Sequence, residues 1–195
     1  MIIDEEIKNY GLKNGVPITK DDTLSLICEI VNKNNCKQIL EIGTAIGFGS
    51  LTISINTKLE HLDSVEIDKE RCKIAKKNIK NAKMQAKISV FNADAKDFLK
   101  TCDKKYDLVY LDGPKGQYIN YLPDIVRVLI DGGIIVADNL YFHGMVTGKI
   151  PISRGCRAMI KGLKAYINEI TTNPIFETKI FDIGDGVGVS VVHKQ

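Results

Sequence analysis

Strand-like and helix-like segments alternate along most of this 195-residue sequence. Apolar residues recur at helical spacings of three and four within 20–34, and a short apolar run over 38–42 then ends at Gly43. The same order repeats downstream, with strands expected at 61–67, 87–91, 106–111 and 133–137 and helices at 50–58, 69–83, 95–101 and 117–130. Regular alternation of this kind predicts a doubly wound α/β fold, with helices covering both faces of a mostly parallel sheet.

The C-terminal part departs from this alternation. Residues 154–172 predict one long basic amphipathic helix, which strand-like runs at 175–182 and 187–193 follow. The Gly-Asp-Gly sequence at 184–186 is typical of a hairpin turn between them. We therefore expect a Rossmann-like, mostly parallel seven-stranded sheet that ends in an antiparallel hairpin, and a single domain over the whole chain.

The composition is that of an ordinary globular protein, with 44% hydrophobic and 26% charged residues. The longest apolar runs are strand-sized, and the first ten residues, MIIDEEIKNY, are too acidic and polar for a secretory signal. The five cysteines include no C-x-x-C pair, which is typical of reduced thiols rather than of disulfides or a zinc site. We therefore expect a cytoplasmic protein without a membrane segment. A net charge of +3 indicates no strong polyanion partner by itself.

The turn after the first expected strand, EIGTAIGFGS at 41–50, is the first candidate site. Its glycines let the chain turn tightly and let a ligand approach the backbone, and the next helix begins with unpaired N–H groups. Glu66 ends the second strand about 20 residues later, where a carboxylate can accept hydrogen bonds from ribose hydroxyls. An ordinary tight turn would explain the glycines alone, but together with Glu66 they favour nucleotide binding.

The charge around this turn indicates which nucleotide is bound. The glycines follow the order Gly43-x-x-x-Gly47-x-Gly49, which differs from the G-x-G-x-x-G pattern of dinucleotide sites. Glu41, two places before the first glycine, suits a cationic sulfonium and ammonium group but not a pyrophosphate. We therefore expect S-adenosylmethionine rather than NAD. The expected cofactor-binding residues are Glu41, Gly43, Thr44, Gly47, Ser50, Glu66, Asp94, Ala95 and Asp112.

The segment Asn92-Ala93-Asp94-Ala95 follows the third expected strand. It resembles the loop whose aspartate binds the adenine edge in methyltransferases. The alternative is that Asp94 caps the N-terminus of the next helix, and both roles are compatible.

Polar side chains follow two further strands. Asp112 comes directly after 106–111, and Asp138 and Asn139 come directly after 133–137. Ligands of open parallel sheets bind at the carboxyl ends of the strands, so these groups can converge. Three oxygen donors suit Mg²⁺, with water and substrate oxygens in its remaining positions. Such residues are also common as ordinary loop caps, but their presence on two strands favours a metal site.

In these segments the sequence resembles the metal-dependent O-methyltransferases, a family that includes catechol and caffeoyl-CoA O-methyltransferases. EIGTAIGFGS, VEID, NADA, LDGPKGQY and GGIIVADN match family segments in order, and the resemblance covers residues 16–192. It implies that Asp112, Asp138 and Asn139 bind the metal and that Lys115 is the general base, so Asp112 and Lys115 are the expected catalytic residues. A nearby divalent cation would favour the neutral form of a lysine that is otherwise a plain surface residue.

Two departures from the family pattern bear on assembly and on the loop. Relatives usually carry an additional N-terminal helix that helps to build a dimer, and little precedes Val16 here. Pro114 stiffens the DGPKG loop where a less restricted residue is usual. We expect a homodimer, although the first departure leaves the oligomeric state open.

The substrate follows less directly from the sequence. The metal would hold a substrate oxygen that attacks the methyl group in line, and two adjacent oxygens occur both in a catechol and in 5-hydroxyuracil. The sequence looks similar to bacterial tRNA 5-hydroxyuridine methyltransferases, which act at the wobble position of the anticodon loop. Five basic residues, Lys149, Arg154, Arg157, Lys161 and Lys164, could contact the phosphates of that loop.

Three interpretations therefore remain. A solvated basic helix explains the five cations equally well, which leaves a small phenolic diol as the alternative substrate. A nucleotide-binding module without catalysis is a third interpretation. The Asp/Asp/Asn set and Lys115 disfavour it, because a module that only binds a nucleotide needs neither a metal nor a base.

Overall fold

The computed structural model describes residues 5–194, so the first four residues of the polar N-terminal segment lie outside the described residues. The chain forms two compact units, Met1–Phe98 and Leu99–Gln195. Between residues 5 and 194, every helix is too short or too polar to cross a bilayer.

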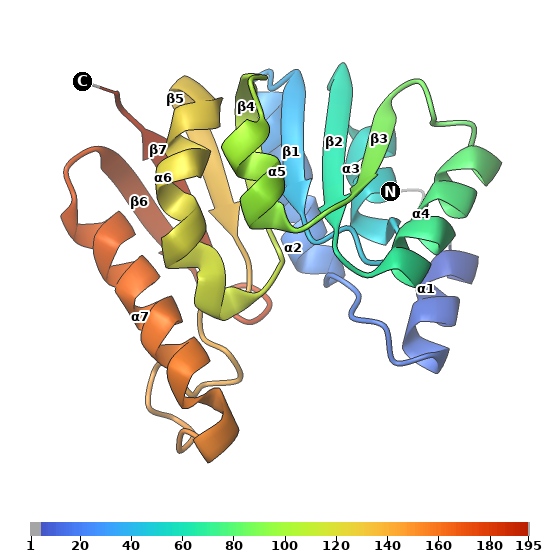
Figure 1. Ribbon diagram of the computed structural model, residues 1–195. Coiled ribbons are helices and arrows are strands. Elements are labelled where there is room, and N and C mark those ends of the chain that lie inside the picture. Colours follow the sequence, from blue (N-terminus) through green and yellow to red (C-terminus); the bar gives the residue numbers. More distant parts are fainter. Residues whose placement is uncertain (1–4, 195) are drawn as a thin grey trace. The chain divides into compact units, whose positions relative to one another are not determined.

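The first unit is built on three parallel strands in the order β3-β2-β1 (Figure 1). The strands are β1 (Gln38–Ile42), β2 (His61–Glu66) and β3 (Ile88–Asn92). All residues of β1 and β2 after the first are buried, as the apolar runs of the sequence predict for strands covered on both faces.

Four helices belong to this unit: α1 (Glu5–Lys13), α2 (Asp21–Lys33), α3 (Phe48–Asn56) and α4 (Lys69–Asn81). Both α3 and α4 contact β2 and β3, and α3 lies behind these strands in Figure 1. The helix α5 (Ala95–Thr101) spans the boundary between the units.

The second unit contains four strands in the order β4-β5-β7-β6. β4 (Tyr106–Leu111) and β5 (Leu129–Ala137) are parallel, whereas β7 (Val187–Val192) runs antiparallel to both β5 and β6 (Phe176–Phe181). The predicted doubly wound α/β fold, with mostly parallel strands and an antiparallel hairpin at the end, is therefore confirmed.

Two α-helices and two short 3₁₀ turns complete the second unit: α6 (Tyr118–Val128), α7 (Arg157–Thr172), η1 (Lys115–Gln117) and η2 (Arg154–Cys156). α6 and α7 contact each other, and both lie in front of the strands of this unit in Figure 1. The rings of Tyr118 and Tyr166 join them, with centroids 5.5 Å apart at an interplanar angle of 75°.

A close contact between two glycines fixes α7 against η1. A Cβ atom added at Gly162 would collide with the carbonyl oxygen of Gly116, and one added at Gly116 would lie 2.9 Å from the Cα of Met159. Side chains at these positions would separate the helix from the turn that carries Lys115.

Most elements lie within two residues of their predicted bounds, and three differences go beyond this. β5 begins at Leu129 rather than at 133, because Gly132 takes a φ of 72° and lets an irregular stretch join the strand. The expected helix 154–172 begins with the 3₁₀ turn η2. The sequence did not predict α1, which precedes Val16. Among its residues only Ile7 and Gly11 are buried, too few for a recognisable apolar stripe.

Candidate active site

The glycine-rich turn of the first unit is built from left-handed backbone conformations. Gly43, Ala45 and Gly47 have φ values of 107°, 47° and 84°. The N–H of Gly43 donates to Val65 O at 3.0 Å, and the N–H of Gly47 donates to Thr44 O at 2.8 Å. Glycine is suited to these conformations because it has no Cβ. Gly47 gives α3 no side-chain cap, which leaves its N-terminus suited to a carboxylate.

Glu41 lies at the centre of a buried polar cluster beside this turn. Its side chain is 1% exposed and accepts hydrogen bonds from Ser50 Oγ and, at 2.5 Å, from Ser64 Oγ. The Thr44 hydroxyl lies 2.5 Å from the same Ser64 hydroxyl. A Cβ atom added at Gly49 would lie 2.8 Å from Glu41 Oε1. The structure thus brings three predicted cofactor residues, Glu41, Thr44 and Ser50, into one network.

Glu66 ties the end of β2 to the same turn. Its Oε2 accepts the N–H of Ala45 at 2.8 Å, and its Oε1 accepts the N–H of Asp68 at 2.9 Å. The side chain therefore braces the backbone, which the sequence did not predict. An ionised carboxylate has further lone pairs for ribose hydroxyls, so the ribose role stays a prediction.

Asp94 caps α5, as one of the two interpretations of its segment predicted. Its Oδ1 accepts the N–H of Lys96 at 2.7 Å, and its carbonyl oxygen accepts the N–H of Phe98 at 2.9 Å. Ala95, the next residue, is buried. The adenine contact predicted for this pair stays a prediction.

In the second unit, strand pairing brings the predicted metal residues together. Leu111 and Ala137 are partners in the β4–β5 register, so Asp112 and Asp138 follow neighbouring strand ends. The N–H of Asp138 donates to Leu111 O at 3.0 Å. Asn139 comes next, with a φ of 59°, and its N–H donates to Asp138 Oδ1 at 2.7 Å.

The surroundings of Asp138 disfavour the charged form of its carboxyl group. Burial raises its pKa to about 6, and the negative charge of Asp112 adds to this effect. The N–H of Asn139 and the charge of Lys115 oppose it only in part. Two carboxylates therefore repel each other at the end of β4 and β5.

Lys115 is paired and partly buried rather than free on the surface. Its Nζ donates to Asp112 Oδ1 at 2.6 Å, and the two side chains are 14% and 18% exposed. Pro114 directly precedes the turn η1 with a φ of −69°, which is the value that the proline ring imposes. The restricted backbone that the sequence predicted here therefore fits the turn. The predicted catalytic residues Asp112 and Lys115 thus lie together.

Sequence reasoning missed two residues near this cluster. Tyr118 is buried, and its hydroxyl donates to Leu111 O at 3.0 Å; burial raises its pKa well above the ordinary value. Asp185, in the turn before β7, contributes to the raised pKa of Asp138. Both belong to motifs noticed in the sequence, KGQY and the Gly-Asp-Gly turn, but only the folded chain brings them to Asp138.

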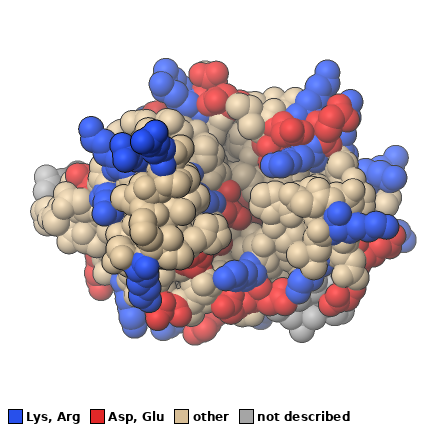
Figure 2. Space-filling view, turned by 90° about the horizontal axis from the view of Figure 1, so that it is seen from below, with Lys and Arg blue, Asp and Glu red and all other residues tan. Residues whose placement is uncertain are grey.

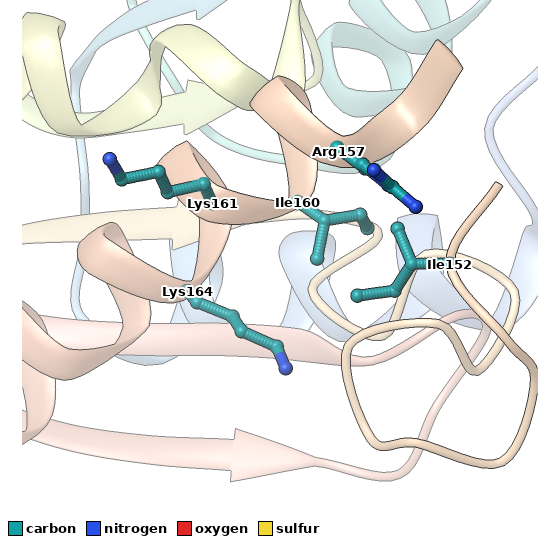
Figure 3. A pocket seen from close by; sticks show the side chains of 5 residues that line it. All are labelled: Ile152, Arg157, Ile160, Lys161 and Lys164. Carbon is teal, nitrogen blue, oxygen red and sulfur yellow. The ribbon is translucent and has the colours of Figure 1, made fainter. Parts of the chain in front are cut away.

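Three of the five predicted phosphate contacts, Arg157, Lys161 and Lys164, line a pocket of about 550 Å³ together with Ile152 and Ile160. Lys149 and Arg154 are not part of this lining. Figure 3 shows Arg157 and Ile152 close to the Ile160 side chain, with Lys161 and Lys164 farther along α7. Lys and Arg side chains gather at this end of the unit, at the upper left of Figure 2. Within residues 5–194, none of the five predicted phosphate contacts forms an ion pair with an acidic side chain.

Comparison with known proteins identifies the family. The model of a family described as O-methyltransferase matches residues 2–194. A caffeoyl-CoA O-methyltransferase of Populus kitakamiensis is 25% identical over 191 residues, which cover 92% of this chain and 80% of that protein. A flavonoid 3',5'-methyltransferase of Vitis vinifera is 26% identical over 197 residues, covering 95% and 81%.

Solved structures agree with this assignment. A Staphylococcus aureus structure, assigned provisionally as a caffeoyl-CoA O-methyltransferase, superposes with a TM-score of 0.89 at 29% identity, covering 96% of this chain and 91% of that one. A Bacillus cereus O-methyltransferase solved in complex with SAH has the same fold, with a TM-score of 0.84 at 19% identity and coverage of 96% and 89%. The chain therefore belongs to the O-methyltransferase family of S-adenosylmethionine-dependent enzymes.

Proposed function

We propose that this O-methyltransferase requires a divalent cation held by Asp112, Asp138 and Asn139. The observation that carries the proposal is the repulsion between the first two carboxylates, which contributes to the pKa of about 6 at Asp138. A divalent cation would relieve this repulsion, and a carboxylate pair with an amide oxygen fits the oxygen ligands of Mg²⁺. Residues 5–194 contain no cluster of three or more His, Cys, Asp or Glu side chains suited to a metal, and the proposed set combines two carboxylates with the amide of Asn139.

The cofactor side of the reaction belongs to the first unit. We assign the methionine carboxylate of S-adenosylmethionine to the uncapped N-terminus of α3 and the adjacent glycine turn. The buried Glu41 carboxylate supplies the negative charge that a sulfonium or ammonium group favours. Glu66 and Asp94 remain the candidates for the ribose and the adenine.

The proposed acceptor of the substrate's hydroxyl proton belongs to the second unit. A substrate oxygen forms a bond to the methyl carbon, the carbon–sulfur bond breaks, and its electron pair stays on sulfur, which leaves S-adenosylhomocysteine. The bound cation would hold the substrate oxygen and lower the pKa of its hydroxyl. Lys115, held 2.6 Å from Asp112, is the proposed acceptor of the hydroxyl proton.

For the substrate, we propose 5-hydroxyuridine at the wobble position of tRNA, which would become 5-methoxyuridine. The support is the three cations that line the α7 pocket, Arg157, Lys161 and Lys164, which form no ion pair within the described part of the chain, since phosphates are the natural partners of such a surface. A wobble base lies in a single-stranded loop and is accessible without opening a helix.

The second candidate substrate is a small phenol with adjacent oxygens. The names of two relatives, a caffeoyl-CoA O-methyltransferase and a flavonoid 3',5'-methyltransferase, favour it. Either substrate offers two oxygens to one cation, so the candidate metal site is compatible with both.

Mass spectrometry of tRNA nucleosides from a strain lacking this gene separates the two. The tRNA proposal expects 5-methoxyuridine to disappear and 5-hydroxyuridine to accumulate, with rescue by the parent gene but not by Asp138→Ala. Unchanged tRNA nucleosides, together with methylation of caffeoyl-CoA by the purified protein, would favour the phenol instead. Full activity in the presence of a chelator would contradict metal dependence.

A further inference from the structure

The segment directly after Asp138 is held in an unfavourable backbone conformation. Asn139, Phe142 and His143 have φ values of 59°, 43° and 53°, and none of them is a glycine. Such conformations are unfavourable for residues that carry a Cβ, so they persist only where the surroundings impose them. We call residues 139–146 the strained loop.

The turn between β6 and β7 provides the contacts that hold this loop. The N–H of Leu140 donates to Gly186 O, and the N–H of Tyr141 donates to Asp185 O, both at 2.9 Å. The Asp185 carboxylate accepts the N–H of His143 with both oxygens, at 3.0 and 2.9 Å. Three backbone amides of the strained loop are therefore bound by one turn.

The glycines of β7 and its turn let the two segments approach closely. A Cβ atom added at Gly186 would lie 2.7 Å from the ring of Tyr141, and one added at Gly188 would lie 2.6 Å from Leu140 Cδ1. The Gly-Asp-Gly sequence therefore also contacts the strained loop: its aspartate accepts the N–H of His143, and its second glycine leaves room for the ring of Tyr141.

We propose that Asp185 is a positioning residue for the candidate cation site. It fixes the strained loop and thereby the orientation of Asn139, the first residue of that loop. The N–H of Asp138 ties it to the end of β4, and the N–H of Asn139 donates to Asp138 Oδ1. On its other side, Asn139 is followed by Leu140, whose N–H is bound by the turn between β6 and β7. The proposal rests on the proposed function, because it requires Asp138 and Asn139 to hold the cation.

The test compares Asp185→Ala and Asp185→Asn with Asp182→Ala, a change at an exposed acid just before the same turn. Mn²⁺ affinity is measured by electron paramagnetic resonance on the full chain without substrate, and S-adenosylmethionine affinity by calorimetry. We expect Asp185→Ala to weaken Mn²⁺ binding roughly 10–100-fold, as is usual for residues that orient metal ligands, with cofactor affinity unchanged. Asp185→Asn keeps an acceptor oxygen for His143 and should recover most of the loss.

Hydrogen exchange gives a readout that does not involve metal. The amide of His143 loses its side-chain acceptor in Asp185→Ala and should exchange faster there than in the parent or in Asp182→Ala. Mn²⁺ affinity equal to that of the parent would overturn the proposal, as would an equal loss of cofactor affinity. If the parent itself binds no Mn²⁺, the proposed function fails and this inference fails with it; parent binding with an unaffected variant overturns the inference alone.

Discussion

At Asp138, burial and a neighbouring carboxylate raise the pKa to about 6, so ionising this side chain costs folding free energy. The cost is complete above pH 6 and disappears as the pH falls through the ordinary value of 3.8, because the carboxyl group is then protonated in both the folded and the unfolded chain. A site that binds a cation tolerates such a cost, since the ligand offsets it.

Asp138→Asn should therefore stabilise the metal-free protein while it abolishes methyl transfer. Removal of the charge is expected to add up to about 3 kcal/mol to the free energy of unfolding at pH 8, and much less at pH 4.5. Urea unfolding with chelator present, at both pH values, measures the difference. Asp182→Asn, at an exposed position, serves as the control and should change neither stability nor activity. Equal stability of parent and Asp138→Asn at pH 8 would show that this carboxylate carries no such cost.

Glu66→Ala should weaken binding of S-adenosylmethionine. The change removes a proposed ribose acceptor and also the acceptors of the Ala45 and Asp68 amides, a loss of about 1.5–3 kcal/mol for a charged hydrogen-bond partner. Calorimetry measures the dissociation constant, which should rise at least tenfold. Glu70→Ala, on the exposed side of α4, is the matched control. An unchanged constant for Glu66→Ala would limit this residue to a structural role.

At the scale of elements, the contact of α7 with η1 sets the position of Lys115. Gly162→Ala places a methyl group against the Gly116 carbonyl oxygen, so either the helix or the turn must move. We expect turnover to fall at least tenfold while S-adenosylmethionine affinity stays the same, because this contact lies within the second unit and the proposed cofactor residues Glu41 and Glu66 belong to the first. Activity and calorimetry on the purified variant test this, and Gly155→Ala, where an added Cβ meets nothing within 4 Å, is the control. Normal turnover in Gly162→Ala would mean that the turn adapts without moving the lysine.

Most elements were predictable from the sequence because each one has a local pattern of apolar residues. The apolar run of β1 and the helical stripe of α2 lie where their patterns placed them. The sequence did not predict α1, because this helix buries only two residues. It also did not predict the start of β5, because the sequence around Gly132 is typical of a turn, although the strand continues through it. Boundaries of that kind depend on contacts made elsewhere in the fold.

The residues of the candidate site were predictable to a smaller extent. Asp112 and Asp138 could be paired in advance because parallel strands end at the same edge of a sheet. The backbone-bracing role of Glu66 and the role of Asp185 could not, since Asp185 lies 46 residues from Asn139 in the sequence and reaches the strained loop only through the β5–β7 pairing. Long-range contacts of this type leave no periodic signal.

At the scale of the whole molecule, the substrate proposal predicts a charge effect that is separate from the chemistry. Arg154→Glu combined with Arg157→Glu should impair methylation of hydroxyuridine-containing tRNA and leave activity on a small diol, where present, nearly intact, because phosphate contacts supply affinity without touching the reacting atoms. Methylation of tRNA by the parent should also fall steeply as salt rises, while turnover of a small molecule should respond weakly.

The paired measurements are initial rates on both substrates at low and moderate salt, with Lys179→Glu, an exposed change on β6, as the control. Equal losses on both substrates would assign the arginines to the fold, and unchanged tRNA activity would remove the α7 pocket from the case for tRNA.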